Sequence, residues 1–397
     1  MSGWGPMAAA AGSAGSAGSA GSAGSAGSAG SAGSGAPVVG YDGVMGMPGY
    51  SGLVPNTMLA NSLVLSRDLL LSGMASLGMT MPDKLRLSSY RDHGDGSGQY
   101  AASIEHLQPN VRAALGELEA RQGLSVTGRG DGDVELKSTE MLLKLKRPSF
   151  DTIKGEQLKL VLSYADLRGE RINEIVSQVV PQTALWAAIA GLTPERHRFT
   201  WELLGIGLRL AMVTVMDFKL RMNVPRPTDL SALVQPMILT PGYTAYPSGH
   251  ATEAYFAAEF LSILAAAILN EDKRSGSATL GDGAQDLPTQ LHRAAFRIAE
   301  NRVVAGLHYP VDSMAGQVLG IVLARWFVSR CCKLQVKPVN RGITFDASAA
   351  QANCELSLDV RPEDNALMKF GTPVTGTPTP GSVLSWLWAK AATEVKG

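Results

Sequence analysis

The chain has 397 residues, of which 45% are hydrophobic and 18% charged, which is enough apolar material for a sizeable core. Its 35 lysines and arginines balance its 35 aspartates and glutamates, and a neutral field attracts neither nucleic acid nor an anionic membrane surface. We therefore expect no nucleic-acid partner, and any anion site must be local.

Neither secretion nor a membrane span is expected from the sequence. The first basic residue is Arg67, so the start lacks the charged and apolar regions of a secretory signal. The longest charge-free apolar stretch, Ile175 to Pro194, is interrupted by Gln178, Pro181 and Gln182, which favours two short helices. The three cysteines are too few for a disulfide framework. We expect a cytoplasmic protein without a membrane span.

The first 150 residues divide into two parts. Residues 1–50 are dominated by Gly-Ser-Ala triplets, which are typical of a low-complexity, disordered tract. Residues 51–150 are expected to hold accessory helices and loops. Apolar spacing predicts helices over Leu59–Met74 and Val111–Arg121, and glycine- and aspartate-rich loops frame the second.

Long helices are predicted for residues 151–330. An apolar stripe runs over Glu156–Val180, and a second helix around Trp186 stops at Gly191. Thr193, followed by a proline, is expected to cap a third helix that reaches about Met222.

An irregular stretch of about twenty residues follows, which is long for a mere connection and is expected to be functional. Three more helices are predicted over His250–Leu269, Thr289–Ala305 and Pro310–Arg330. Residues 331–397 are rich in proline, glycine and threonine, with β-prone pieces at Gly342–Phe345 and Cys354–Val360. We expect them to form a small irregular C-terminal appendage on the helical body.

Three segments carry residues suited to binding an anion. Lys219 near a helix end and Arg226 before a proline can be held close together. Taken singly, each is more often an ordinary surface charge.

The Pro247-Ser248-Gly249-His250 run enters a helix, where glycine lets backbone approach a ligand and the free N–H groups, with the Ser248 hydroxyl, can cradle anionic oxygen. His250 can exchange a proton with that oxygen near neutral pH, whereas alone it would read as a core histidine satisfied by a carbonyl.

The third segment contains Arg302, His308 and Asp312. A third cation suits an anion with two or three negative charges. If a helix opens at Pro310, Asp312 lies one turn from His308, accepts one ring N–H and leaves the other nitrogen as nucleophile or ligand.

Taken together, the pattern Lys219-x6-Arg226-Pro227, Pro247-Ser248-Gly249-His250 and Arg302-x5-His308-x3-Asp312 resembles the signature of the vanadium-dependent haloperoxidase and type 2 phosphatidic acid phosphatase superfamily. The resemblance spans roughly residues 157 to 330. It implies an all-α fold built around a four-helix bundle of the acid phosphatase and vanadium haloperoxidase type, with residues 151–330 as the catalytic bundle.

For a haloperoxidase, the resemblance implies a vanadate cofactor whose vanadium is bound by His308, while His250 acts as acid-base on hydrogen peroxide. The remaining cofactor-binding residues would be the cations and the helix start, namely Lys219, Arg226, Ser248, Gly249 and Arg302. For a phosphatase, phosphate or a phosphoester would occupy the same pocket. His308 would then attack phosphorus, Asp312 would orient it and His250 would protonate the leaving group.

The chain departs from the family pattern at three positions. Asn301 stands where serine is common before the arginine, and Met216 and Tyr243 stand where the chloroperoxidases have tryptophan and phenylalanine. The halide is therefore expected to be bromide or iodide instead of chloride.

Three functions remain open. A vanadate-dependent haloperoxidase is favoured, because membrane phosphatases need spanning helices and secreted acid phosphatases are shorter chains with signal peptides. A soluble phosphomonoesterase acting through a phosphohistidine at His308 is the alternative. A non-catalytic anion-binding protein is disfavoured by the intact pair His250 and His308. The sequence leaves the oligomeric state open and allows a homo-oligomer.

Overall fold

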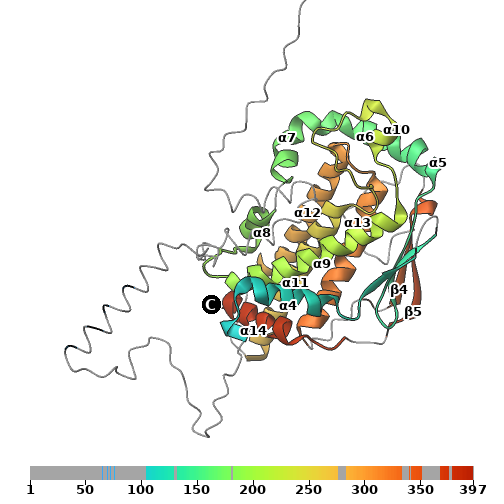
Figure 1. Ribbon diagram of the computed structural model, residues 1–397. Coiled ribbons are helices and arrows are strands. Elements are labelled where there is room, and N and C mark those ends of the chain that lie inside the picture. Colours follow the sequence, from blue (N-terminus) through green and yellow to red (C-terminus); the bar gives the residue numbers. More distant parts are fainter. Residues whose placement is uncertain are drawn as a thin grey trace, which may run out of the picture.

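Four long helices form the centre of the computed structural model (Figure 1). They are α9 (Arg198–Met222), α11 (Gly249–Ser275), α12 (Gly283–Val304) and α13 (Pro310–Cys331). Helix α11 packs against each of the other three. Buried alanine, leucine, valine and phenylalanine side chains of these helices join in one hydrophobic core. The predicted helical bundle is confirmed, although the structure also contains a small sheet that an all-α fold does not include.

The structure describes residues 104–396 except 129–131, 180–181, 276–282, 333–338, 340, 351–366 and 375–377, together with Leu65, Leu69, Ser72 and Ser76. The low-complexity tract and the β-prone piece Cys354–Val360 lie outside the described residues. So does most of the helix predicted over Leu59–Met74, although its described residues are helical.

Two glycines let α13 approach α11 closely. A Cβ atom on Gly316 would lie 2.6 Å from the carbonyl oxygen of Ser248, and one on Gly320 would lie 2.3 Å from that of Thr252. No side chain fits at either position without moving backbone. The close approach places the first turns of the two helices together, where the amide of Ser248 donates to the carbonyl of Asp312 at 2.9 Å.

Short helices gather across one end of the bundle, as Figure 1 shows. They are α5 (Phe150–Thr152), a π-helical turn (Ile153–Gln157), α6 (Leu158–Tyr164), a 3₁₀ turn (Ala165–Leu167), α7 (Arg168–Ser177) and α10 (Pro227–Leu230). Helix α8 (Thr183–Ala190) lies at the side of the bundle and contacts α12. The segment Glu156–Val180, predicted as a single helix, is therefore mostly helical but is divided into α6 and α7 by the 3₁₀ turn. At the π-helical turn, the Gln157 side chain points inward and accepts a hydrogen bond from the Val311 amide of α13 at 3.0 Å.

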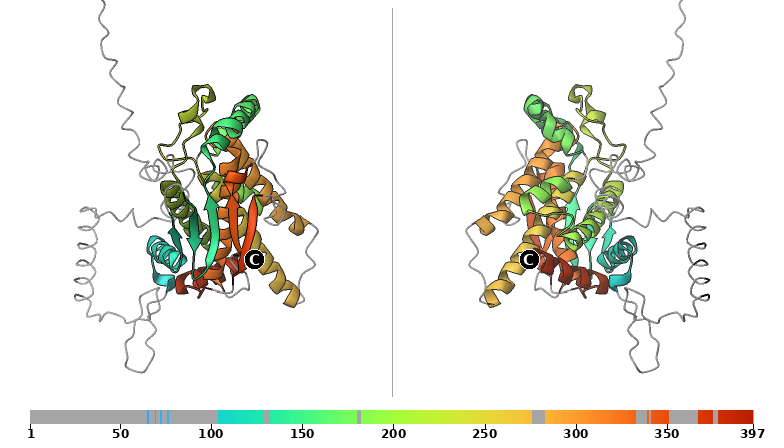
Figure 2. Two further views of the ribbon diagram at one scale, coloured as in Figure 1. Left: turned by 90° about the vertical axis from the view of Figure 1, so that its right-hand side faces the viewer. Right: turned by 90° about the vertical axis from the view of Figure 1, so that its left-hand side faces the viewer.

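A five-stranded sheet packs beside the helices, as the two side views in Figure 2 show. Its strands are β1 (Ser125–Thr127), β2 (Val134–Lys137), β3 (Met141–Lys146), β4 (Arg341–Asp346) and β5 (Met368–Pro373), paired in that order. All pairs are antiparallel except β3 with β4. The first three strands were not predicted, because their residues read as loops and accessory segments. Their buried side chains include Val134, Leu136 and Leu145, whose alternation is typical of strands.

The C-terminal residues are more regular than expected. The predicted strand Gly342–Phe345 is confirmed by β4, but the last residues form the helix α14 (Ser382–Lys396), which packs on α9 and on α4 (Pro109–Arg121). The Glu119 carboxylate of α4 accepts hydrogen bonds from the amides of Val383 and Leu384 at the start of α14. Segments from both ends of the described chain therefore share one sheet and one helical layer.

The start predicted for the third helix is wrong. Residues 194–196 form a turn, and α9 begins at Arg198. The reason lies far along the chain, because Glu394 of α14 accepts hydrogen bonds from the amides of Phe199 and Thr200 at 2.8 and 2.9 Å and caps the helix there. Among the described residues, Gly249–Ile268 and Pro310–Cys331 are long and apolar enough to cross a membrane, but 72% and 89% of these stretches are buried inside the protein.

Candidate oxyanion-binding active site

The structure brings the predicted site residues together at the end of the bundle where α11 and α13 begin. The side chains come from the last turn of α9, the turn after it, the start of α11, the end of α12 and the start of α13. All of them are buried: Lys219, Arg226, Ser248, Gly249, His250, Arg302, His308 and Asp312. A cluster of charged groups this deep in a protein requires paired charges or a ligand.

His308 is oriented by Asp312. Its Nδ1 lies 3.1 Å from Asp312 Oδ2, which also accepts a hydrogen bond from the Tyr309 amide at 2.9 Å. The first turn of α13 therefore fixes both partners, as the spacing predicted. Because a carboxylate accepts, Nδ1 carries the proton and Nε2 keeps its lone pair. Burial lowers the pKa of His308 well below its ordinary value, and Arg226 lowers it further.

Arg226 lies directly against the free nitrogen of His308. Its NH1 is 3.0 Å from His308 Nε2 and donates to the Leu307 carbonyl at 2.9 Å, while its Nε donates to the Tyr243 carbonyl at 2.9 Å. Its NH2 is buried and has no hydrogen-bond partner among the described residues. An anion beside His308 would supply that partner.

Arg302 faces the site from α12 with most of its donors unused. Only NH2 is engaged, by the Ile175 carbonyl at 3.0 Å and by Gln178 Oε1 at 3.1 Å. Its Nε and NH1 are buried and find no partner in the part of the chain that the structure describes. Burial lowers the pKa of Arg302 to about 10, so the guanidinium remains charged at neutral pH.

Lys219 is held by neutral oxygens. Its Nζ donates to the carbonyls of Thr244 and Ala245 at 2.9 and 2.6 Å and lies 5.4 Å from the centroid of the Tyr243 ring. Burial lowers its pKa well below the ordinary value, and the neighbouring Arg226 adds to this. An anion bound beside Lys219 would raise this pKa and favour the positively charged ammonium group.

The carboxyl groups do not balance the three cations. Burial raises the pKa of Asp312 to about 7 in spite of nearby Lys219 and Arg226. Burial also raises the pKa of Glu253, whose Oε1 is buried without a partner among the described residues. Two carboxyl groups at most face three basic side chains, and burial weakens the ionisation of both carboxyl groups, so the site favours added negative charge.

His250 contacts both the protein backbone and the site. Its Nε2 lies 3.1 Å from the Gln178 carbonyl, so this nitrogen carries a proton. Burial lowers the pKa of His250, and Arg302 is the first of the cations that lower it further. One nitrogen is thus satisfied by a carbonyl, as in an ordinary core histidine, and Nδ1 is the nitrogen left for proton exchange.

Two polar residues near the site have hydrogen bonds that limit their contacts to an anion. The Ser248 amide donates to the Asp312 carbonyl and its Oγ lies 3.4 Å from the Ala251 amide, so only the hydroxyl proton is left for a ligand. The Asn301 amide nitrogen is used by Glu174 and Gln178, both at 3.0 Å, and does not replace the serine contact of the family. Both N–H groups of the Asn301 side chain are thus used by acceptors on α7 or directly after it, and nothing in the sequence around Asn301 indicated this.

Other residues of the site were missed by the sequence analysis. Gln178 read as a polar interruption of an apolar stretch, and Glu253 as one charge on a long helix. Both are buried beside the cations. The signal for Glu253 was its position one turn after His250, on the same face of α11.

The donor set fits a tetrahedral oxyanion such as vanadate or phosphate. The orphaned Nε and NH1 of Arg302 and NH2 of Arg226 are buried donors that an oxyanion can satisfy. Lys219 and the Ser248 hydroxyl add to them, and His308 Nε2 is the free ligand nitrogen. Vanadium or phosphorus could bond to that nitrogen once Arg226 NH1 shifts off it.

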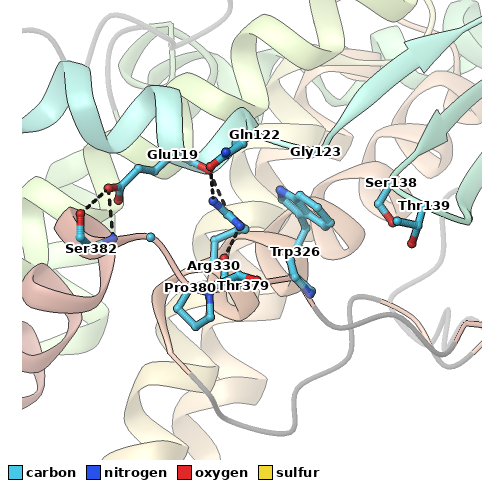
Figure 3. A pocket seen from close by; sticks show the side chains of 12 residues that line it. Glu119, Gln122, Gly123, Ser138, Thr139, Trp326, Arg330, Thr379, Pro380 and Ser382 are labelled. Carbon is cyan, nitrogen blue, oxygen red and sulfur yellow. Dashed lines mark hydrogen bonds between the residues drawn. The ribbon is translucent and has the colours of Figure 1, made fainter.

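A separate cavity lies at the other end of α13. It has a volume of about 590 Å³ and is lined by residues such as Glu119, Trp326 and Thr379 (Figure 3). Its arginine, Arg330, donates to the carbonyls of Glu119 and Thr379 and to Gln122 Oε1. Its arginine is thus paired with other lining residues, and none of the predicted site residues lies there.

Comparison with known proteins places the bundle in a family. Residues 200–332 match the family model described as the PAP2 superfamily. This segment of the chain belongs to the PAP2 superfamily. It contains every predicted site residue from Lys219 to Asp312, whereas α7 with Gln178 precedes the matched PAP2 segment.

No curated protein matches the chain. Among solved structures, one described as the first bacterial vanadium-dependent iodoperoxidase is similar to this chain, with 21% sequence identity and a TM-score of 0.31. The similarity covers 43% of this chain and 47% of that one, so it spans about half the length of the iodoperoxidase.

Proposed function

We propose that the chain is an enzyme that holds vanadate at this site and oxidises halide with hydrogen peroxide, with bromide or iodide as the halide. One observation supports the anion site: Arg226 and Arg302 keep buried guanidinium nitrogens without a partner among the described residues, and both arginines lie close enough to His308 to lower its pKa. When bound, vanadate supplies the electrophilic centre that activates peroxide toward halide.

The roles of the side chains follow from their contacts. Arg226, Arg302 and Lys219 neutralise the oxyanion, and His308 supplies the ligand nitrogen while Asp312 holds its ring. His250 exchanges a proton with peroxide through the nitrogen that Gln178 does not occupy. The Tyr243 ring, 5.3 Å from the Arg226 guanidinium carbon, leaves less apolar surface for a halide than phenylalanine would.

The setting of the chain favours this reaction over a membrane phosphatase. The two described helices that are apolar enough to cross a membrane are largely buried in the bundle, as expected for core helices. We place the protein in the cytoplasm on the sequence alone, as a further part of this proposal.

The second candidate is a phosphomonoesterase, and the orientation of His308 is the observation that favours it. A ring with Nδ1 held by Asp312 and Nε2 unprotonated is arranged for attack on phosphorus. The N–P bond would form as the ester P–O bond breaks, and His250 would give a proton to the leaving alcohol. Water would then release phosphate from His308.

Two assays on one preparation separate the candidates. Protein incubated with vanadate is tested for bromination of monochlorodimedone with peroxide and bromide. Vanadate-free protein is tested for cleavage of a phosphomonoester and for inhibition by vanadate. Bromination that His308→Ala abolishes supports the haloperoxidase. Ester cleavage without any halide oxidation overturns it, and absence of both activities with retained anion binding indicates a non-catalytic anion-binding protein.

A further inference from the structure

The C-terminal end of α7 contacts the site from outside the segment that matches the family model. Gln178 directly follows α7 and is 8% exposed, and Ile175 on the last turn is fully buried. The helix is otherwise held by ion pairs, including Arg297 with Glu174 at 2.7 Å. Its end therefore reaches the site through a small number of polar contacts.

The Gln178 side chain holds Arg302 by one edge. Its Oε1 accepts from Arg302 NH2 at 3.1 Å, and the Ile175 carbonyl accepts from the same nitrogen at 3.0 Å. The Asn301 amide donates to Gln178 Oε1 at 3.0 Å and keeps that oxygen in place. Because the planar guanidinium is fixed at NH2, its Nε and NH1 keep one direction. Those are the two donors that have no partner among the described residues.

The Gln178 backbone acts on the other side of the site. Its carbonyl oxygen lies 3.1 Å from His250 Nε2 and can only accept, so it fixes the tautomer of this imidazole. One residue thus contacts an anion-binding arginine through its side chain and the acid-base histidine through its main chain.

We propose that Gln178 is a positioning residue, which aims Arg302 at the bound oxyanion and holds His250 with Nδ1 toward it. This inference rests on the proposed oxyanion site. Mutation of a residue that holds a ligand-binding side chain in place typically weakens ligand binding by roughly 10- to 100-fold.

Two substitutions at Gln178 test the inference. Gln178→Met removes the acceptor and keeps the side-chain length and the main-chain carbonyl, and we expect a 10- to 100-fold loss of vanadate affinity. Gln178→Glu keeps the acceptor but adds a negative charge beside Arg302. It should retain thermal stability and still bind vanadate weakly, because the new carboxylate competes with the anion. If Gln178 had only a structural role, vanadate affinity would fall only in a variant whose thermal stability also falls.

The matched control is Arg297→Gln, which breaks the ion pair of α7 with Glu174 but touches neither Arg302 nor His250. Its affinity should stay within about twofold of the wild type. Vanadate affinity is measured by equilibrium dialysis, with inorganic phosphate as a second probe. Wild-type affinity in Gln178→Met, or an equal loss in Arg297→Gln, overturns the inference while the proposed function stands. Failure of the wild type to bind either anion overturns the proposed function itself.

Discussion

His308 Nε2 lies 3.0 Å from Arg226 NH1, so the nitrogen that we propose as the ligand of the oxyanion is in contact with a cation of the same site. Both groups are buried, and Arg226 is anchored by the carbonyls of Tyr243 and Leu307. An oxyanion that bonds Nε2 would displace NH1 from the ring and receive its hydrogen bond. In this proposal His308 would bond the oxyanion at the same place where Arg226 would neutralise its charge.

The orienting role of Asp312 predicts a large loss in Asp312→Asn. An amide can present its N–H₂ to Nδ1 and favour the wrong tautomer, so we expect catalysis to fall about 10²- to 10⁴-fold. Turnover of bromide or of the phosphomonoester is the measurement. The control is Asp217→Asn, which removes a half-exposed partner of Arg221. Comparable turnover in Asp312→Asn and the wild type would show that the carboxylate does not orient His308.

The unused donors of Arg302 predict that charge alone does not make the site. Arg302→Lys keeps the charge but loses the fork whose Nε and NH1 are buried without partners in the described chain. We expect oxyanion affinity to fall about 10- to 100-fold, as for loss of hydrogen bonds to a charged group. Equilibrium dialysis with vanadate measures it, and undiminished affinity would mean that Arg302 acts only as a distant charge.

The close contact of α11 and α13 predicts that small additions disturb the fold. Gly320→Ala would place a Cβ atom 2.3 Å from the Thr252 carbonyl oxygen, so the helices must separate. We expect a loss of about 1–3 kcal/mol in the free energy of unfolding. Gly169→Ala on α7 is the control, because its Cβ would meet nothing within 4 Å. Denaturant unfolding of both variants measures this. Equal free energies of unfolding in the two variants would mean that α11 and α13 can separate without loss of stability.

The lowered pKa of His250 predicts that oxyanion binding weakens as pH rises. Burial lowers this pKa first, followed by the charges of Arg302, Arg226 and Lys219. A bound anion offsets those charges and raises the pKa, so the complex takes up a proton. Affinity is then highest below the pKa of the free protein and falls, by up to about tenfold per pH unit, until the pKa of the complex is passed. Asp312, whose pKa burial raises to about 7, adds in the same direction.

The measurement is binding of a fully ionised oxyanion such as tungstate as a function of pH. His250→Gln removes the imidazole contribution and should make the dependence shallower. The same slope in wild type and variant would assign the proton uptake to Asp312 or another group.

The sequence predicted those parts of the site whose geometry is local. Asp312 follows His308 by one helical turn, so their pairing could be expected from spacing once Pro310 opened a helix. The contacts of Gln178 and the cap that Glu394 places on α9 join residues far apart in the chain, and no local pattern indicates them. The strands β1 to β3 were missed because they are short and the glycine- and aspartate-rich stretch between β1 and β2 was read as a loop beside a helix. The pairing of β3 with β4, where Leu143 lies opposite Ile343, joins residues far apart in the chain, and no local pattern indicates it.

Anomalous scattering from a crystal of the protein soaked with vanadate would locate the oxyanion. We predict a vanadium peak at bonding distance from His308 Nε2, with Arg226 NH1 displaced from the ring and Arg302 Nε and NH1 donating to the oxyanion. A vanadium peak elsewhere, or none at a vanadate concentration that saturates the protein in solution, would contradict it.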